Sequence, residues 1–354
     1  MKKITIGLFS ALLSFSAWFT SAAELRDDHP EFHIVQPGDT LWDISEMFLK
    51  SPWLWPEIWH VNNQVENPHL IFPGDIIALV YIDGQPRITK NMMPNGTIKL
   101  RPKARELSAD SAISTIPLDA ISPFLTSAQV VSKEELDNAA YIVGSDSGRV
   151  LAAENNKVYV RGVKNEADVK FTFFREGNPY IDPNTQELLG IEAIHVAEGL
   201  KEQHGDPTVM RLKKSVTEVR KGDLAIPTNE EQLRPLYFPH APDNFEDGQI
   251  ISVYGGVEQI GQYHIVVINR GEREGMEIGH VLSIYQRGIT MEDEIAEERN
   301  DNSETGDVLS EVVTLPDEYA GRLMIFRTFE KVSLGLVLKA ERAIHKFDKV
   351  KTPL

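Results

Sequence analysis

The sequence of 354 residues contains no cysteine. This absence excludes disulfides, zinc–thiolate sites, thiol nucleophiles and the acylated cysteine of a lipoprotein. The fold must therefore be held together by packed apolar cores. Hydrophobic residues make up 42% of the chain, which is ordinary for globular material, and the length is sufficient for two or three domains.

Positive charge is scarce as well. Lys and Arg total 36 against 53 Asp and Glu, which gives a net charge of -17, and the cationic residues form no stripe along the sequence. A polyanion is repelled by such a chain at long range, so we expect no nucleic-acid partner.

Only one apolar run is long enough to be considered for a membrane, and it lies at the N-terminus. Lys2 and Lys3 precede mostly apolar residues 4–19, and Ser21-Ala22-Ala23 supplies the small residues of a signal-peptidase site. A retained anchor is the alternative, but Ser and Thr interrupt the run. We therefore predict a signal peptide over residues 1–23, no stable transmembrane anchor after its cleavage, and a periplasmic location.

Two short segments carry the most specific pattern in the chain, and each contains a Pro-Gly-Asp turn. Residues 37–39 interrupt a strand and precede a helix that begins near Leu41, with Asp39 or Thr40 as its cap. Residues 73–75 precede a short apolar strand. With a second helix expected from Pro56 onward, the inferred order is β-α-α-β.

This pattern resembles the LysM domain over residues 32–82. Residues 33–44 fit the family's opening H/Y-x-V-x-x-G-D-T-L-x-x-I, Asn63 fits its central Asn, and residues 71–75 fit its I-x-P-G-D/Q close. LysM domains bind N-acetylglucosamine-containing glycans, chiefly peptidoglycan and chitin, without cleaving them. The resemblance implies a groove between the first turn with the adjoining helix start and the loop before the second strand.

The resemblance places ten candidate glycan-binding residues on the two walls of that groove. They are Gly38, Asp39, Thr40, Leu41 and Trp42 on one wall, and Asn63, Ile71, Phe72, Pro73 and Gly74 on the other. Sugar amides and hydroxyls need backbone groups at close approach, which glycines permit, while N-acetyl methyls and ring faces pack on apolar side chains. Core packing is an equal alternative for Leu41 and Ile71.

Residues 51–59 contain three of the five tryptophans of the chain, between the two expected helices. Aromatic faces bind sugars, but a tryptophan in so small a domain commonly belongs to the core. We expect Trp59 to be buried and either Trp53 or Trp55 to be partly exposed, as a secondary contact for glycan or protein.

Beyond residue 82 the pattern changes. Pro and Gly recur over residues 83–140, which predicts a connector with short extended and helical pieces, including a capped helical turn at Ser132. Short apolar segments then predict two β-rich domains over residues 141–235 and 245–354, with a hairpin turn at Asn155-Asn156.

The second β-rich block weakly echoes the first, which indicates either a tandem pair of small barrels or sandwiches or a chance likeness of short strands. Residues 291–307 hold eight Asp or Glu and are expected to form a solvated acidic loop. The predicted fold class is α+β, a small βααβ LysM domain followed by β-rich barrel or sandwich domains.

Residues 268–282 resemble the C-terminal domain of flagellar assembly protein T. A signal peptide, a LysM domain and such a region in one chain are similar to type IV pilus secretin-associated proteins, in which the LysM domain tethers an outer-membrane secretin ring to peptidoglycan. The resemblance implies a non-catalytic scaffold at the cell wall and outer membrane, with peptidoglycan and an envelope protein such as a secretin as partners. A flagellar or general envelope assembly factor is an alternative.

A peptidoglycan hydrolase is a further alternative, because LysM domains are often fused to such enzymes. The ten histidines form no H-x-H or H-E-x-x-H pattern, and the chain has no G-x-S-x-G or S-x-x-K motif. A lytic glycosidase needs only a well-placed Glu, but those enzymes are mainly helical. We therefore expect no enzymatic activity, no catalytic residue, no cofactor and no metal site. His195, His264 and His280 are expected to be structural or surface residues.

Overall fold

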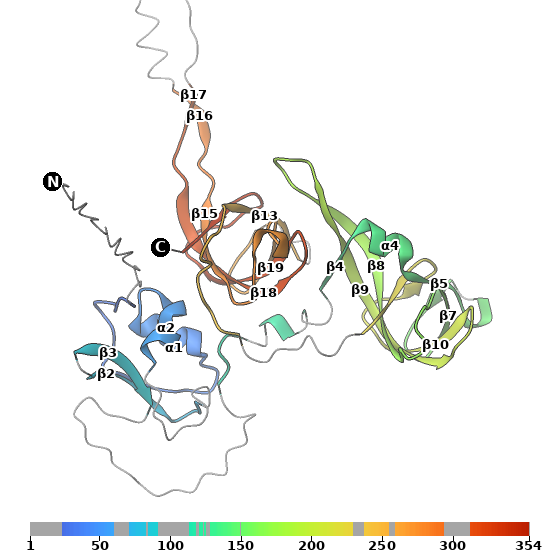
Figure 1. The fold of residues 1–354 in the computed structure, drawn as a ribbon, viewed down its shortest axis with the longest axis horizontal. Coiled ribbons are helices and arrows are strands. Elements are labelled where there is room, and N and C mark those ends of the chain that lie inside the picture. Colours follow the sequence, from blue (N-terminus) through green and yellow to red (C-terminus); the bar gives the residue numbers. More distant parts are fainter. Residues whose placement is uncertain are drawn as a thin grey trace, which may run out of the picture.

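The computed structural model describes residues 23–59, 71–82, 84–90, 113–117, 120–122, 124, 128–148, 150–228, 237–254, 259–293 and 312–353. The predicted signal peptide lies almost entirely outside these ranges. The described residues are rich in strands and form an N-terminal module and two bodies of β-strands (Figure 1). Although the chain reaches the second β body last, this body lies between the N-terminal module and the first β body in Figure 1.

The N-terminal module contains β1 (Phe32–Ile34), α1 (Leu41–Phe48), η1 (Pro52–Leu54), α2 (Trp55–Ile58), β2 (Ile76–Ile82) and β3 (Gln85–Lys90). The strands pair antiparallel in the order β1-β2-β3. Strand β3 falls in the segment expected to be a connector. Helix α1 begins where the sequence predicts, because Thr40 and Asp43 form a reciprocal capping box.

The first β body contains β4 (Gln129–Val131), α4 (Lys133–Asn138), β5 (Ala140–Ser145), η3 (Asp146–Gly148), β6 (Leu151–Ala152), β7 (Lys157–Arg161), β8 (Lys170–Ile181), β9 (Leu188–Gln203), β10 (Thr208–Ser215), β11 (Val219–Arg220) and β12 (Leu224–Pro227). Its sheet has the order β10-β7-β5-β12-β8-β9-β4, and a further pairing of β9 with β10 closes six of these strands into a ring. The predicted capped turn at Ser132 is confirmed, since Ser132 and Glu135 cap α4.

The hairpin predicted at Asn155-Asn156 is wrong. Strand β6 pairs with β11, whereas β7 pairs with β5 and β10. Asn155 has a φ of 67°, so the turn exists, but the strands that flank it belong to different sheets.

The second β body contains β13 (Gly248–Val253), β14 (Ile265–Ile268), η5 (Glu272–Glu274), β15 (Val281–Gln286), β16 (Thr290–Glu292), β17 (Val312–Thr314), β18 (Glu318–Thr328), β19 (Ser333–Ala340) and β20 (Lys349–Lys351). Six strands form a closed barrel in the order β13-β14-β19-β18-β15-β20. Strands β16 and β17 form a separate two-stranded ribbon that projects from the barrel (Figure 1). The expected acidic loop, residues 291–307, therefore has its first two residues in strand β16, and residues 294–307 lie outside the described part of the chain.

The two barrels have the same strand pairings. In the first, the ring runs β5-β7-β10-β9-β8-β12, and in the second it runs β13-β14-β19-β18-β15-β20, so each pair of neighbours in one ring has its counterpart in the other. The likeness of the two β-rich blocks therefore extends to their topology, as expected of a tandem repeat.

The turn before the last strand of each barrel repeats the same hydrogen bonds. Asp223 Oδ2 accepts from the Arg220 amide at 2.7 Å, and Asp348 Oδ2 accepts from the His345 amide at 2.8 Å. The residue before each Asp has a positive φ, 92° at Gly222 and 74° at Phe347. Glycine adopts this backbone without strain, whereas phenylalanine rarely does.

One apolar cluster, called the shared cluster below, joins all three bodies. It comprises Trp42, Trp53, Ile116, Ile121, Ala128, Tyr180, Leu189, Tyr237, Ile251, Ile265, Val267, Val281, Met324, Phe326, Val332, Leu334, Leu336 and Leu338. Strand β14 shows how it forms, because Val266 and Ile268 face the barrel core while Ile265 and Val267 face the shared cluster. The run of four apolar residues is thus buried on both faces, which explains why it lacks alternation.

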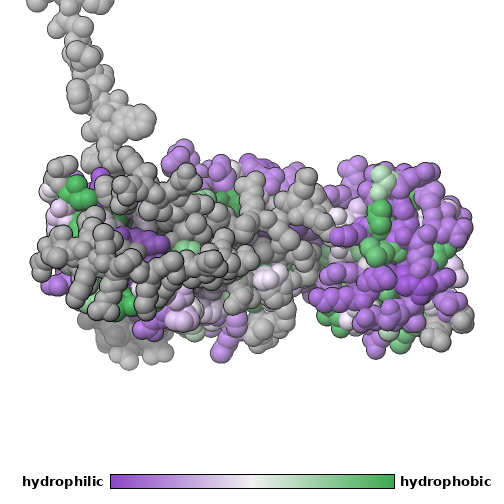
Figure 2. All heavy atoms as spheres, turned by 90° about the horizontal axis from the view of Figure 1, so that it is seen from below, coloured by the Kyte–Doolittle hydropathy of each residue, from purple (hydrophilic) through white to green (hydrophobic). Residues whose placement is uncertain are grey.

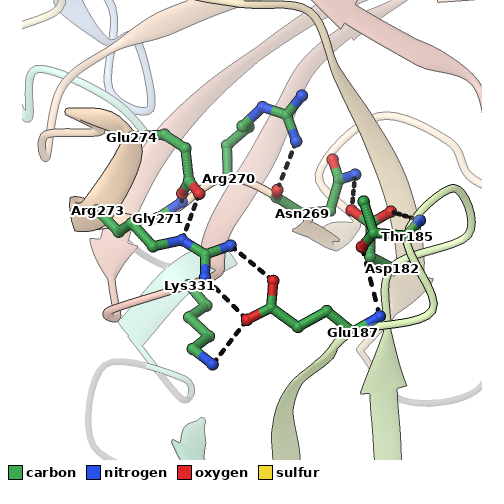
Figure 3. Close-up of polar contacts among 9 residues, drawn as sticks. All are labelled: Asp182, Thr185, Glu187, Asn269, Arg270, Gly271, Arg273, Glu274 and Lys331. Atoms are coloured by element: carbon green, nitrogen blue, oxygen red, sulfur yellow. Dashed lines mark hydrogen bonds and ion pairs between the residues drawn. The ribbon is translucent and has the colours of Figure 1, made fainter.

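Polar contacts also hold the tip of the β8–β9 hairpin against the second barrel (Figure 3). Asn269 Nδ2 donates to Asp182 Oδ2 at 2.7 Å, and Asn269 Oδ1 accepts from the Gln249 amide at 2.7 Å. Asn269 is 2% exposed, so its amide makes both bonds away from solvent. Buried polar groups with partners of this kind fix the orientation of the elements that carry them.

An ion-pair network lies beside this amide (Figure 3). Glu187 contacts Arg273 at 2.9 Å and Lys331 at 2.8 Å, and these cations lower the pKa of Glu187 to about 2. Because the pKa in the folded state lies below that in the unfolded chain, this contribution to stability is complete above the unfolded value and is lost as the pH falls through about 2. The residues Ile268–Leu282, singled out by resemblance, thus supply much of the contact between the barrels.

Substitution of Asn269 tests the contact between the β8–β9 hairpin and the second barrel. Replacing Asn269 with Asp sets a second carboxylate against Asp182, so at pH 7 we expect the free energy of unfolding to fall by about 2 kcal/mol. Thermal unfolding followed by circular dichroism should show a lower midpoint at pH 7 and partial recovery, relative to wild type, at pH 4, where the pair can share a proton.

Asn269→Ala serves as the control, because it removes the same hydrogen bonds without adding charge. Its loss should be similar at both pH values. If the Asp and Ala variants behave alike at pH 7 and pH 4, the close approach of Asn269 to Asp182 is contradicted.

Candidate functional site

The first wall of the candidate site is the turn and helix start at residues 38–42. Gly38 has a φ of 97°, and the Gln36 amide donates to Asp39 Oδ2 at 2.8 Å. His33 Nε2 lies 2.7 Å from the same oxygen. The carboxylate of Asp39 therefore holds the turn, and both of these contacts use Oδ2.

The second wall, residues 71–74, is built in the same way. Gly74 has a φ of 93°, and the Phe72 amide donates to Asp75 Oδ2 at 2.8 Å. The two walls are tied together because the Gly74 amide donates to the Val35 carbonyl at 2.8 Å and the Val35 amide donates to the Asp75 carbonyl at 2.9 Å. The structure thus brings both sequence motifs to one place, called the two-walled site below.

Most side chains of the two-walled site are used for core packing or helix capping. Leu41 and Ile71 are buried in the core of the module, so the core alternative is correct for both side chains. Thr40 is buried as the helix cap, and Trp42 is buried in the shared cluster. Phe72 and Pro73 are half-buried, and Gly38 and Gly74 are exposed. Asn63 lies outside the described residues.

The two walls present backbone amides and carbonyls as hydrogen-bonding groups. A helix leaves its first amides without partners inside the helix. In α1, the capping box satisfies the amides of Thr40 and Asp43, while those of Leu41 and Trp42 point outward from the helix start. On the other wall, the carbonyl of Ile71 is the corresponding backbone acceptor.

A segment of the connector uses all three of these groups. Ser114 accepts from the Leu41 amide at 2.9 Å, and Thr115 accepts from the Trp42 amide at 3.0 Å, both through their carbonyl oxygens. The Ile113 amide donates to the Ile71 carbonyl at 2.7 Å. Residues 113–115 therefore bridge the two walls. This segment was not predicted from the sequence, where its β-branched residues Ile113, Thr115 and Ile116 are the only local sign.

The expectation for the tryptophans is wrong. Trp53 and Trp55 are both buried and Trp59 is half-buried. Trp55 lies in the core of the module, with its ring 6.0 Å from that of Trp59 in an edge-on arrangement. Trp53 instead belongs to the shared cluster, where the Arg322 guanidinium of β18 lies 4.8 Å from its ring centroid.

The module is therefore docked on the second barrel. Trp42 and Trp53 supply the apolar part of this contact, and Lys339 of β19 donates to the carboxylate of Glu46 on α1. Both charged groups are partly exposed, so the ion pair contributes little compared with the two buried indoles.

Comparison with known families supports the assignment of the module. Residues 33–79 match the LysM domain family. The chain therefore contains a LysM domain, a non-catalytic binding domain whose members bind N-acetylglucosamine-containing glycan such as peptidoglycan and occur in extracellular or cell-wall-associated proteins. No curated protein matches the chain.

Within the described ranges, no helix is long and apolar enough to cross a membrane.

One group of side chains in these ranges has the composition of a metal site. Ligand atoms of His240, Glu277 and His280 lie within 4.8 Å of one another. However, His280 Nδ1 lies 3.1 Å from the Glu277 amide and must accept its proton, which leaves Nε2 protonated in the neutral ring. Burial lowers the pKa of His280, which favours this neutral form. The two imidazoles instead form an edge-on ring pair with centroids 4.7 Å apart, and His240 Nδ1 lies 2.9 Å from the Phe238 carbonyl oxygen.

Trp53 lies in the shared cluster and Phe48 lies in the module core, so we expect Trp53 to stabilise docking on the second barrel and Phe48 to stabilise the module itself. Trp53→Ala should lower the free energy of unfolding by about 3 kcal/mol, because a buried indole is lost from the docking contact. In hydrogen exchange followed by mass spectrometry, peptides from β18 and from residues 113–117 should lose protection while α1 stays protected.

Phe48→Ala is the matched comparison, since Phe48 is buried in the module core. This variant should expose α1 to exchange. If Trp53→Ala deprotects α1 as much as Phe48→Ala does, Trp53 supports the module itself and the docking role is contradicted.

Proposed function

We propose that the chain is a non-catalytic, peptidoglycan-binding scaffold of the cell envelope. The observation that carries the proposal is the convergence of the two LysM half-motifs into one two-walled site, whose amides at Leu41 and Trp42 and carbonyl at Ile71 face the same space. The acetamido group of N-acetylglucosamine offers one N–H donor and one C=O acceptor, which complement such a site.

The remaining walls suit a sugar ring. Phe72 and Pro73 are half-buried and present apolar surface, and Gly38 and Gly74 are exposed and leave the backbone accessible. Asn63, which lies outside the described residues, completes the proposed set from the family motif. In this proposal, the glycan-binding residues remain the ten of the sequence analysis, with Asp39, Thr40, Leu41, Trp42 and Ile71 acting through the backbone that they fix or supply.

We also propose an exported, periplasmic protein, with residues 1–23 as its signal peptide. The role of the two barrels is to bind a protein partner, and the resemblance to secretin-associated proteins favours a secretin ring. The β16–β17 ribbon supports a protein partner, because it exposes apolar side chains at Ile289, Met291, Val312 and Leu315. By contrast, the face of the first barrel at the right of Figure 2 is mainly hydrophilic.

Co-sedimentation with purified sacculi tests the glycan-binding half. Residues 24–354 should pellet with the sacculi, and Phe72→Ala should bind about tenfold more weakly because the apolar surface beside the sugar is lost. Phe32→Ala is the control, since Phe32 is an exposed aromatic residue of β1 that belongs to neither wall, and this variant should bind like wild type.

A protein that stays in the supernatant at every concentration of sacculi contradicts the proposal. The supernatant also tests for catalysis: we expect no soluble muropeptides, and their release would instead establish a peptidoglycan hydrolase.

Photo-crosslinking in cells tests the partner-binding half. A photoreactive residue in place of Val312, which is 58% exposed on the ribbon, should form an adduct with an outer-membrane secretin, identified by mass spectrometry. The same residue at Val150, exposed on the first barrel, is the control and should give no such adduct. An adduct with a flagellar component would favour the alternative assembly role and contradict secretin tethering.

A further inference from the structure

Residues 113–116 occupy the backbone groups on which the proposed glycan site depends. Each amide has one proton to donate, so while Leu41 and Trp42 donate to Ser114 and Thr115 they have no full hydrogen bond left for a sugar. The peptide groups of this segment offer the same donor and acceptor as an acetamido group. The segment and the glycan therefore compete for the same atoms.

The segment is anchored on its C-terminal side. Thr115 is 1% exposed and Ile116 is fully buried in the shared cluster. The Tyr237 amide lies 3.4 Å from Thr115 Oγ1, which adds a weak polar contact to the chain that leads into the second barrel. On its other side, Ile113 is only partly buried against the module core. The end beside Ile71 is thus held less firmly than the end beside Trp42.

We propose that residues 113–116 act as a built-in competitor that closes the two-walled site, and that glycan binds by displacing this segment. The inference rests on the proposed glycan-binding function and adds a regulatory step to it. The apparent affinity of the site equals its intrinsic affinity multiplied by the fraction of molecules in which the segment is released. Ile116 belongs both to this segment and to the shared cluster that holds the LysM domain on the second barrel. Displacement of the segment by glycan therefore also weakens the docking of the LysM domain.

Variants that weaken the segment should therefore bind glycan more tightly. Ile113→Pro removes the amide that donates to Ile71, whereas Ile113→Ala trims the same side chain and keeps the amide. Titration of residues 24–354 with tetra-N-acetylchitotetraose in a calorimeter should give at least about a tenfold lower Kd for Ile113→Pro than for wild type, and a smaller change for Ile113→Ala.

A second pair of variants separates release of the segment from a general loss of packing in the shared cluster. Ile116→Ala and Ile121→Ala each shorten a fully buried isoleucine of the shared cluster, but only Ile116 belongs to the segment. Ile116→Ala should lower the Kd, and Ile121→Ala should leave it unchanged. Equal gains in both variants would show that loosening the cluster is sufficient and would overturn the specific role of the segment.

Hydrogen exchange of the wild-type chain tests displacement directly. On addition of the same tetrasaccharide, peptides that cover residues 113–117 should lose protection. If glycan binds while these amides stay protected and the Ile113→Pro variant gains no affinity, the competitor is ruled out and the glycan-binding function stands. If neither wild type nor Ile113→Pro binds glycan while both are folded by circular dichroism, the proposed function fails, and the inference fails with it.

Discussion

The arrangement of this protein depends on the shared cluster, in which apolar side chains from the LysM domain, the connector and both barrels exclude water together. Each of the three bodies also has an apolar core of its own, centred on residues such as Phe48, Phe173 and Leu282. The shared cluster is separate from these three cores. Its contribution is to set their positions, and because burial of apolar surface is non-directional, one cluster can join elements from very different parts of the chain.

A second constraint follows from the small size of the LysM domain. Its side chains at Asp39, Thr40, Leu41 and Ile71 are needed for turns, a cap and the core, so in the proposed function ligand recognition falls largely to the backbone. Backbone donors and acceptors do not distinguish a peptide group from an acetamido group. A connector with the right spacing can therefore enter a site suited to a sugar.

The sequence predicted features that depend on local contacts. Helix α1 begins after Thr40 and helix α4 begins after Ser132. Each of these residues forms a capping box with an acidic residue three positions later, and both boxes are present. The strand-rich remainder and the likeness of its two halves were also visible, because equivalent strands keep similar apolar patterns. The positions of the two motifs in one site followed from the family resemblance, since residues 38 and 74 are far apart in the sequence.

Features that depend on distant partners were not predictable. Trp53 is buried by a barrel strand that contains Arg322, and no local pattern around residue 53 indicates that surface. The pairing of β6 with β11, about 70 residues later, similarly defeated the prediction of a hairpin at Asn155. The role of residues 113–116 could not be predicted, because it depends on hydrogen bonds with Leu41, Trp42 and Ile71, which lie more than 40 residues earlier in the sequence.

The spatial order of the three bodies has a mechanical consequence. The LysM domain packs on the second barrel through Trp42 and Trp53, and the β16–β17 ribbon projects from the same barrel, so a force between domain and ribbon passes through this side-chain packing. This packing is non-covalent, whereas the chain that joins the two bodies is covalent. The docking contact can therefore open under load while the protein remains one chain.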